Sequence, residues 1–236
     1  MKLNPIIFGS TGMLGQAVLS ECLSDNEVES VLIVNRRKSN FSHPKVREIV
    51  HPDLFNLTPI AGELIGFNTC FFCLGVSSAG MSEKEYHKTT YELTLHIAET
   101  LLHTNEEMTM CFVSGTGSDS SEQGKVMWAR VKGKTENALL AMPFKKAYMF
   151  RPAYIQPAKG IKSRTPLYNV LYAITKPLYF LLKHSDRYVT NTGYFAKAML
   201  LAARYGYEKN ILENTDINRI VRLYQGNKSD HPGAGA

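Results

Sequence analysis

The feature that most constrains the fold is a glycine-rich turn near the amino terminus. Residues 6 to 15 read Ile-Ile-Phe-Gly-Ser-Thr-Gly-Met-Leu-Gly, so a short apolar run leads into three evenly spaced glycines. Gly9 allows a sharp turn off a strand, Gly12 allows the backbone to approach a phosphate, and Gly15 allows close packing of a following helix. This order predicts a strand, a turn and a helix that together bind a pyrophosphate.

The backbone amides of this turn are the expected ligands of the pyrophosphate. Free N–H groups and the positive end of the helix dipole both favour an anion at a helix N-terminus. A purely structural turn is the alternative, and the apolar strand before the turn and the amphipathic pattern after it favour a dinucleotide site. The candidate cofactor-binding residues here are Gly9, Ser10, Thr11, Gly12, Met13, Leu14 and Gly15.

The end of the second apolar run indicates which dinucleotide is bound. Residues 31 to 34 are continuously apolar, as in a parallel strand covered on both faces, and Asn35, Arg36, Arg37 and Lys38 follow. NAD enzymes usually carry an acid at this point, about 20 residues past the glycines. Because the acid is absent and guanidinium groups match phosphate geometry, Arg36 and Arg37 predict NADP as cofactor. A solvated basic turn is the alternative.

Composition fits one globular, enzyme-sized unit. The 236 residues are 44% hydrophobic and 20% charged, which is typical of a folded protein that buries a single core. The formal net charge is +6, but the cations are interspersed with acids, so the pattern favours an anionic cofactor and no nucleic-acid partner. The first apolar run is too short for a cleavable signal, which predicts a cytoplasmic location.

The four cysteines are expected to be reduced packing residues. Cys70 and Cys73 have the spacing of a reactive pair, but they lie in an apolar strand. Residues three apart in a strand point to opposite faces, so the two thiols cannot share a disulfide or a metal ion. Cys22 and Cys111 also lie in apolar segments. We therefore expect no metal site.

Apolar runs alternate with helical patterns along the chain, which predicts an α/β, doubly wound parallel sheet, the Rossmann fold. We expect a single domain: a cofactor-binding core over residues 1–155, a substrate-side segment over 156–225 and a flexible tail over 226–236. Ser82 and Glu85 have the spacing of a capping box at a helix start. The expected strands are 4–8, 30–35, 45–50, 68–74, 109–114 and 146–150, followed by 187–190. The expected helices are 12–24, 82–103, 124–141 and 192–205, with an irregular link over 54–66.

Ligands of such sheets bind outside the carboxyl ends of the strands, so residues that follow each strand are candidates. Ordinary turn chemistry is the alternative for any one of them. The hydroxyls of Ser114 and Thr116 are expected beside the nicotinamide, as substrate or carboxamide ligands. The other candidates are cofactor-binding residues: Asp53, Leu54, Leu74, Gly75, Arg151, Pro152 and Ala153.

Several of these motifs form an ordered set: Gly-x-x-Gly-x-x-Gly at 9–15, Asp-Leu at 53–54, Cys-Leu-Gly at 73–75, Ser-Gly-Thr at 114–116, Val-Lys-Gly-Lys-Thr-Glu at 131–136, and Arg-Pro at 151–152. Over about residues 4–205 this set resembles the atypical short-chain dehydrogenase/reductases, and within them the branch of Tat-interacting oxidoreductases. The resemblance implies a Rossmann fold, NADP and reduction of a carbonyl on a small-molecule substrate. It also implies that Lys132 holds the nicotinamide ribose, although a solvated helix lysine is the alternative.

One residue departs from the pattern of the family that the chain resembles. Short-chain reductases carry a tyrosine four residues before the helix lysine, and Trp128 stands there in this chain. Spacing of four keeps Trp128 and Lys132 on one helix face. An indole N–H donates a hydrogen bond but cannot act as the acid, and loss of a general acid forfeits roughly 100- to 10,000-fold in rate. Ser114, Thr116, Trp128 and Lys132 remain the candidate catalytic residues.

Other tyrosines of the chain could supply the acid in place of Trp128. Tyr172 and Lys176 have the catalytic spacing but follow the sixth strand, where the lysine would not reach the ribose. Tyr86, Tyr91 and Tyr154 are the open alternatives.

Residues 167–183 are rich in Tyr and Leu and nearly free of charge. A lid or core packing, a homodimer contact, and a peripheral membrane helix remain open for them. Two functions are predicted for the whole chain: an NADPH-dependent oxidoreductase with a non-standard active site, or a catalytically inactive NADPH-binding sensor or scaffold.

Overall fold

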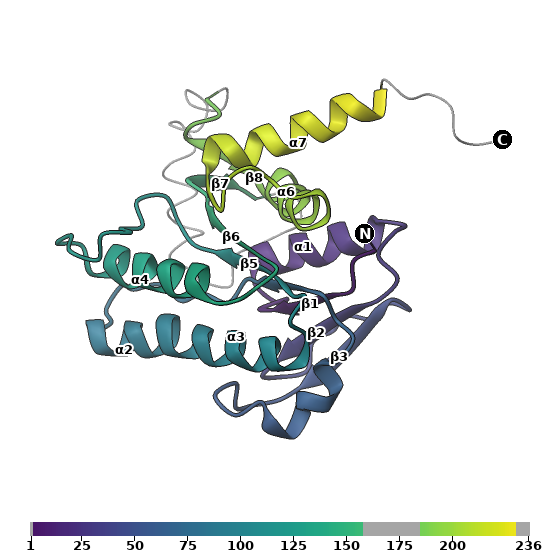
Figure 1. The fold of residues 1–236 in the computed structure, drawn as a ribbon, viewed down its shortest axis with the longest axis horizontal. Helices are drawn as coiled ribbons and strands as arrows, with labels where there is room; N and C mark the ends of the chain where they lie inside the picture. Colours follow the sequence, from purple (N-terminus) through teal and green to yellow (C-terminus); the bar gives the residue numbers. More distant parts are fainter. Residues whose placement is uncertain (1, 158–184, 230–236) are drawn as a thin grey trace.

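The computed structural model describes residues 2–157 and 185–229. Its main sheet holds seven parallel strands in the order β3-β2-β1-β4-β5-β6-β9 (Figure 1). The bounds of these strands are β1 Pro5–Phe8, β2 Val31–Asn35, β3 Val46–Val50, β4 Thr69–Phe72, β5 Thr109–Val113, β6 Lys146–Arg151 and β9 Ile211–Glu213. The predicted doubly wound parallel sheet is confirmed.

The strand order reverses at β1. The chain moves from β1 outward to β3 and then crosses back to β4 on the other side of β1. In open α/β sheets, the ligand crevice lies outside the carboxyl ends of the strands at such a reversal. The fold therefore places the glycine turn, which follows β1, where a ligand is expected.

Helices cover both faces of the sheet (Figure 1). One face packs against α1 (Met13–Ser24), α6 (Thr192–Tyr205) and α7 (Asn214–Ser229). The other packs against η1 (Thr58–Leu64), α3 (Leu93–Thr104) and α4 (Met127–Ala141). Within β1 the buried side chains alternate: Ile7 belongs to the first cluster, and Ile6 and Phe8 belong to the second. Full burial of each such side chain stabilises the fold by roughly 1.5 to 3 kcal/mol.

The helix that precedes α3 begins at the capping box that the sequence predicts and continues into α3. α2 (Glu83–His87) starts at the predicted capping box, in which the Ser82 side chain accepts from the Glu85 amide and the Glu85 carboxylate accepts from the Ser82 amide. It runs through a π-helical segment, η2 (Lys88–Glu92), into α3. The predicted helix over 82–103 is thus one continuous helical stretch with a wider turn in its middle.

The carboxyl-terminal part contains one predicted strand and two strands that the sequence did not predict. The strand expected over 187–190 is β8 (Val189–Asn191), which pairs in parallel with the unpredicted β7 (Tyr154–Gln156) as a separate two-stranded sheet. The unpredicted β9 adds an edge strand beside β6. α7 continues through Ser229, into the first residues of the segment expected to be a tail. The Tyr- and Leu-rich segment 167–183 lies outside the described residues.

The cysteines occupy the positions expected of packing residues. Cys70 belongs to the cluster around α3, whereas Cys73 packs against the cluster around α1, so the two lie on opposite faces of the sheet. All four cysteines are free thiols. Burial raises the pKa of the Cys73 thiol to about 12, which keeps it protonated at neutral pH.

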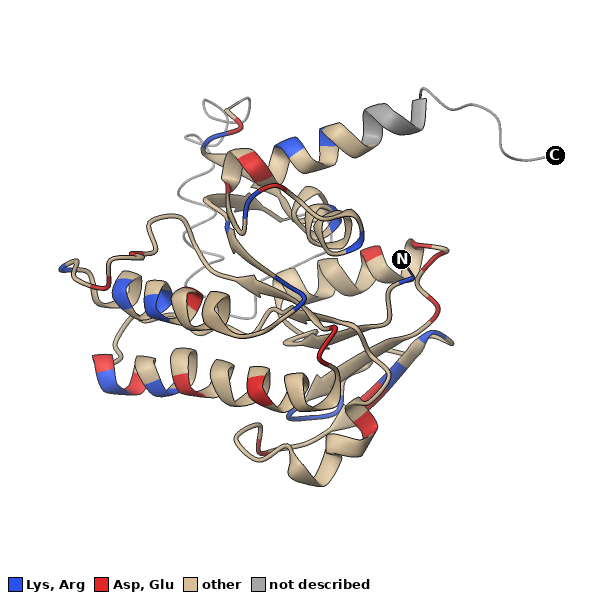
Figure 2. Cartoon of the chain, viewed as in Figure 1, with Lys and Arg blue, Asp and Glu red and all other residues tan. Residues whose placement is uncertain are grey.

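Charge and hydropathy of the described elements add two observations. Lys and Arg side chains are distributed among Asp and Glu over many elements (Figure 2). No helix within residues 2–157 and 185–229 is both long enough and apolar enough to cross a bilayer.

Candidate functional site

The glycine turn after β1 has the geometry that its sequence predicts. Gly9 adopts a φ of +83°, which side chains disfavour, and a Cβ there would lie 2.8 Å from the backbone of Cys73. The amide of Gly12 donates to the Gly9 carbonyl oxygen at 3.0 Å and closes the turn. α1 begins directly after Gly12, and no side chain caps its N-terminus. An uncapped helix start is suited to receive an anion.

Gly15 is the most constrained glycine of the turn. A Cβ at this position would lie 2.1 Å from the carbonyl oxygen of Gly9, well inside van der Waals contact. The first turn of α1 therefore packs directly on the glycine turn. A Cβ at Gly12 would meet only the Gly9 oxygen at 3.4 Å. The close approach thus depends on Gly9 and Gly15, while Gly12 stands at the open side of the helix start.

A groove of about 470 Å³ lies beside this turn. It joins residues from four strand ends that are far apart in the sequence and that the sequence predicted to share a site. The lining residues are Gly9, Thr11, Val34, Asn35, Arg36, Arg37, Lys38, Pro52, Leu54 and Leu74. This composition combines amides, apolar side chains and cations, as expected of a surface that holds an anionic, aromatic ligand.

The cations of the groove have no hydrogen-bond or ion-pair partner among the described residues. Arg36, Arg37 and Lys38 are exposed, and none of them makes a hydrogen bond, ion pair or ring contact with the described residues. The other described arginines each have at least one such partner, as in the bidentate pair of Arg204 with Asp25. Two guanidinium groups side by side without a carboxylate leave positive charge available to a ligand.

Asn35 occupies the position where an NAD enzyme carries an acid, but its side chain is turned inward. Asn35 is 6% exposed, and its Oδ1 accepts from the Ser10 hydroxyl at 3.0 Å. Its Nδ2 donates to Glu48 Oε1 at 2.8 Å. The candidate Ser10 is completely buried, and its hydroxyl is bonded to Asn35 inside the protein. Sequence reasoning missed Glu48, which lies on a neighbouring strand.

The remaining adenosine-side candidates are placed unequally. Leu54 is buried and lines the groove, whereas Asp53 is exposed and its carboxylate accepts from the Phe55 amide at 2.9 Å in a local turn. Leu74 lines the groove and the exposed Gly75 follows it. Met13 and Leu14 pack their side chains against the core around α1. These two residues therefore offer a ligand their backbone rather than their side chains.

The candidate hydroxyls after β5 are engaged inside the protein. Ser114 is 9% exposed, and its Oγ bonds to Ser118 Oγ at 2.9 Å. The Thr116 hydroxyl donates to the Arg151 carbonyl oxygen at 3.0 Å, and the Thr116 amide donates to the Pro152 oxygen at 2.9 Å. These bonds tie the loop after β5 to the end of β6. A substrate would have to compete for them.

Trp128 and Lys132 of α4 both face the end of β5. A Cβ at Gly117 would lie 3.5 Å from the Trp128 ring, so the indole lies beside the loop that follows β5. Lys132 Nζ donates to the Val113 carbonyl oxygen at 2.9 Å and lies 4.7 Å from the Phe112 ring centroid. Burial of the ammonium lowers the pKa of Lys132 to about 8. The structure thus brings this pair together with Ser114 and Thr116.

The guanidinium of Arg151 is bonded inside the protein, and the cofactor contact predicted for this residue stays a prediction. Its Nε donates to both carboxylate oxygens of Glu136 at 3.0 and 3.1 Å, and Glu136 is completely buried in α4. Its other nitrogens bond to Glu213 of β9 at 3.2 Å and to the Ser120 hydroxyl at 2.6 Å. The guanidinium therefore connects α4, β6 and β9 through its hydrogen bonds and ion pairs. The sequence could not show this, because its partners lie 15 and 62 residues away.

The neighbours of Arg151 also have internal partners. The Ala153 amide donates to Asn214 Oδ1 at 3.0 Å, and the Pro152 carbonyl accepts from the loop after β5. Ala153 is thus fixed to α7.

The substitute acids fall in different places. Tyr86 is 3% exposed, and the Tyr91 ring stacks against His87 with centroids 4.7 Å apart. The Tyr154 hydroxyl donates to Gln156 at 3.2 Å within β7. Tyr172 and Lys176 lie outside the described residues. Within the described part of the chain, no group of three or more His, Cys, Asp or Glu side chains is positioned to hold a metal ion.

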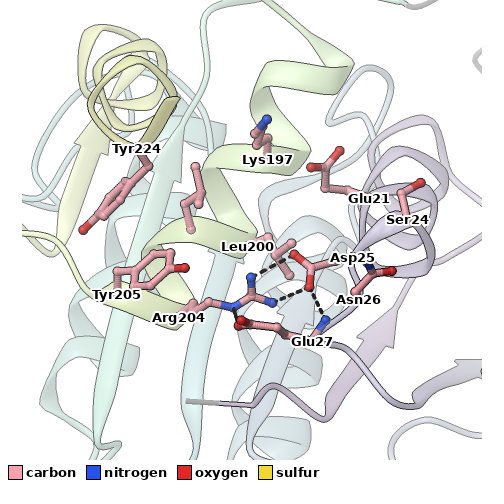
Figure 3. Close-up of a pocket in the computed structure, with 11 residues that line it drawn as sticks. Glu21, Ser24, Asp25, Asn26, Glu27, Lys197, Leu200, Arg204, Tyr205 and Tyr224 are labelled. Atoms are coloured by element: carbon pink, nitrogen blue, oxygen red, sulfur yellow. Dashed lines mark hydrogen bonds and ion pairs between the residues drawn. The ribbon is translucent and has the colours of Figure 1, made fainter. Parts of the chain in front are cut away.

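A larger cavity of about 700 Å³ lies at the other end of α1 (Figure 3). Its charged groups largely pair with one another: the Arg204 guanidinium reaches from α6 to Asp25 with two bonds of 2.8 Å, and to Glu27 at 3.6 Å. Tyr205 and Tyr224 stack with centroids 4.8 Å apart. This cavity is larger than the groove, but its charges are balanced internally and it lies away from the carboxyl ends of the strands. We therefore do not take it as the candidate site.

Comparisons with known proteins support the fold and give distant relatives. No protein-family model matches the chain. Protein FMP52, mitochondrial, of Chaetomium globosum is 24% identical over 232 residues, covering 92% of this chain and 96% of that protein. Protein HTATIP2 of Rattus norvegicus is 24% identical over 151 residues, covering 63% of this chain and 61% of that protein. The chain is thus similar to these proteins at low identity.

Solved structures share the Rossmann-like architecture. A short-chain dehydrogenase/reductase family oxidoreductase from Burkholderia thailandensis superposes with a TM-score of 0.66 at 12% identity, over 96% of this chain and 98% of that one. The enzyme WbmF of Bordetella bronchiseptica, in complex with NAD⁺, superposes with a TM-score of 0.64 at 14% identity, over 96% and 79% of the two chains. At these identities the likeness shows the fold.

Proposed function

We propose that this chain binds NADP(H) and is an oxidoreductase of the short-chain dehydrogenase/reductase type, acting on a carbonyl or hydroxyl substrate. The observation that carries the proposal is the groove beside the glycine turn, where Arg36 and Arg37 have no partner among the described residues. A 2′-phosphate supplies the anion that these two guanidiniums lack, and their planar donors match its geometry.

The glycine turn fits a nicotinamide dinucleotide. The turn can close and α1 can pack on it only because a Cβ is absent at Gly9 and Gly15, where it would overlap backbone atoms, and Gly12 leaves the helix start open to a pyrophosphate. Leu54 and Leu74 line the groove as apolar surface for an adenine ring. The complex of WbmF with NAD⁺ supports a dinucleotide in this type of fold. The choice of NADP rests on the two arginines.

The chemical half of the proposal rests on α4. Bound NADPH would supply a hydride, and the chain would have to orient the carbonyl and deliver a proton. Lys132 lies at the end of β5 with donors to spare beyond its bond to Val113, so we assign it to the nicotinamide ribose hydroxyls. The Trp128 indole can donate a hydrogen bond to a substrate oxygen, but it gives up no proton. The proton would therefore come from another group or from water.

One observation favours a second function, a coenzyme-binding sensor or scaffold without turnover. Trp128 stands in the position of the acid, and the hydroxyls of Ser114 and Thr116 are bonded internally. A site built for reduction is expected to leave such hydroxyls to the substrate.

Two measurements separate these functions. Trp128 is the only tryptophan of the chain, so energy transfer from its indole to bound NADPH reports binding directly. Oxidation of bound NADPH is then followed across a panel of carbonyl compounds. Binding with turnover supports the oxidoreductase, and binding without turnover supports the sensor. Reductase activity gained by Trp128→Tyr would show that the remaining groups of the site are competent.

The cytoplasmic location expected from the first residues remains a proposal. The fungal relatives carry the word mitochondrial in their names, which offers the competing location. Fractionation of cells that express a carboxyl-terminally tagged chain distinguishes the two.

A further inference from the structure

Glu48 holds both ends of the basic segment Arg36 to Lys38. It lies in β3, where it is paired in register with Ile33 of β2. Its Oε1 accepts from Asn35 Nδ2 at 2.8 Å and from the Ser39 amide at 2.9 Å. Asn35 and Ser39 directly flank the three cations, so a single carboxylate oxygen closes this segment into a loop.

The same network reaches the glycine turn. The Ser10 hydroxyl donates to Asn35 Oδ1 at 3.0 Å, and both side chains are buried. Ser10 follows Gly9 in the turn that faces a pyrophosphate. The chain of bonds from Ser10 through Asn35 to Glu48 thus connects the two anion-binding parts of the groove through side chains beneath it.

The Asn35 carboxamide is engaged through both its oxygen and its nitrogen in this arrangement. Its oxygen accepts from Ser10 and its nitrogen donates to Glu48, so it is turned away from a ribose hydroxyl. Position 35 therefore neither binds an unmodified 2′-hydroxyl nor repels a 2′-phosphate. Discrimination at this end of the groove then depends on where the loop holds Arg36 and Arg37.

The carboxylate remains charged in this setting. Burial of the carboxyl disfavours its charge, but the hydrogen bonds from Asn35 and Ser39 and the charge of Lys38 outweigh burial, so the pKa of Glu48 is lowered. Hydrogen bonds to an ionised acceptor are roughly twice as strong as neutral ones. Exposed arginine side chains on an unfixed loop would instead have to be ordered by the ligand, which weakens binding.

We propose that Glu48 is a positioning residue that orders the loop carrying Arg36 and Arg37 and thereby sets the preference for a 2′-phosphorylated coenzyme. This inference rests on the proposed binding of NADP(H). Glu48 acts through Asn35 and Ser39 and is not among the residues that line the groove. Its negative charge opposes a phosphate at longer range, so its expected benefit is geometric.

Three variants separate geometry from charge. Glu48→Ala removes both hydrogen bonds and is expected to lower NADPH affinity about tenfold, the cost of ordering about one residue, while NADH affinity changes less than about twofold. Glu48→Gln keeps an acceptor for both donors without the charge, so its NADPH affinity stays within about threefold of wild type. Glu63→Ala is the matched control. Glu63 of η1 is an exposed acid that pairs with Arg47 of β3, the strand that also holds Glu48, and it does not contact the loop.

The readouts are the dissociation constants of NADPH and NADH, and the hydrogen exchange of the Ser39 amide without coenzyme. Faster exchange in Glu48→Ala than in Glu63→Ala, with loss of preference for NADPH, supports the inference. Equal loss of both coenzymes would make Glu48 a general stability residue, and unchanged preference or unchanged exchange would overturn the positioning role. If wild-type protein binds neither coenzyme, both the proposed function and this inference fail. If wild-type protein and Glu48→Ala both prefer NADPH to the same extent, only this inference fails.

Discussion

The two halves of the candidate site differ in how much of their polar chemistry is already used. In the groove beside the glycine turn, Arg36 and Arg37 have no partner among the described residues. At the carboxyl ends of β5 and β6, Ser114, Thr116 and Arg151 are bonded to other parts of the chain. The polar groups named in the second half therefore support the fold, whereas the two guanidiniums of the first half are exposed to solvent.

The difference shows that a motif residue can keep its place and change its task. Arg151 is the last residue of the sixth strand, where the resemblance places a cofactor contact, yet its side chain is 11% exposed and ion-paired with Glu136 and Glu213. Arg36 and Arg37 are exposed and have no partner among the described residues. Our proposal for coenzyme binding therefore relies on which charged groups are available, more than on their presence in a motif.

The largest effect is expected when the buried ion pair of Arg151 at the carboxyl end of β6 is removed. Glu136→Ala removes the buried carboxylate and leaves the Arg151 guanidinium without its main partner, at an expected cost of about 3 to 5 kcal/mol in the free energy of unfolding. Urea titration measures this cost. Glu107→Ala breaks the exposed pair with Lys145 and is the control, with an expected change below about 1 kcal/mol. Equal, small changes in both would mean that Arg151 is available to a ligand after all.

The next effect concerns the glycine turn. Gly15→Ala places a Cβ 2.1 Å from the Gly9 carbonyl oxygen, so α1 or the turn must move, at roughly 1 to 3 kcal/mol. Coenzyme binding should be lost together with part of the stability, as thermal unfolding and NADPH fluorescence would show. Gly62→Ala in η1 meets open space and should change neither. Normal NADPH binding by Gly15→Ala would contradict the assignment of this turn to the pyrophosphate.

Substitution of Arg36 and Arg37 tests the groove beside the glycine turn without changing the fold. Arg36→Ala combined with Arg37→Ala removes charge-assisted bonds to a 2′-phosphate and should reduce the preference for NADPH over NADH by roughly 10- to 100-fold. NADH affinity and the unfolding midpoint should stay near wild type, because neither side chain has an internal partner among the described residues. A preference that survives the double substitution would assign these residues to a solvated surface.

The smallest effect is a pH dependence from Lys132. Its pKa is lowered in the folded protein from 10.5 to about 8, so the unfolded chain binds the proton more tightly and burial of the ammonium opposes folding below about pH 8. This cost is relieved as the pH rises from about 8 towards 10.5. Relative to Lys132→Met, wild-type protein should gain on the order of 1 to 2 kcal/mol between pH 7 and 10. Parallel stability curves for the two proteins would place the ammonium in water.

Much of the fold could be predicted because its signals are local. Apolar runs such as residues 31 to 34 and the Ser82 capping box each fix an element within a few residues, and the roles of Gly9 and Gly15 follow from their spacing. The short edge strand β9 has only three residues and no apolar run of its own, so only its pairing with β6 defines it.

The candidate site could likewise be predicted only where its residues follow from local sequence signals. The sequence identified several of the residues that line the groove, such as Arg36 and Leu74, because strand ends meet at one edge of the sheet. It missed Glu48 and the internal bonds of Arg151, because their partners come from other strands and helices and are fixed only by tertiary packing. Hydrogen bonds across the sheet leave no spacing pattern in the chain.

Calorimetric titration of NADPH and NADH into the purified wild-type protein tests the central claim most directly. The groove, whose two guanidiniums have no partner in the described part of the chain, predicts saturable heat with both coenzymes and tighter binding of NADPH. No heat with either coenzyme, or equal affinity for the two, would contradict it.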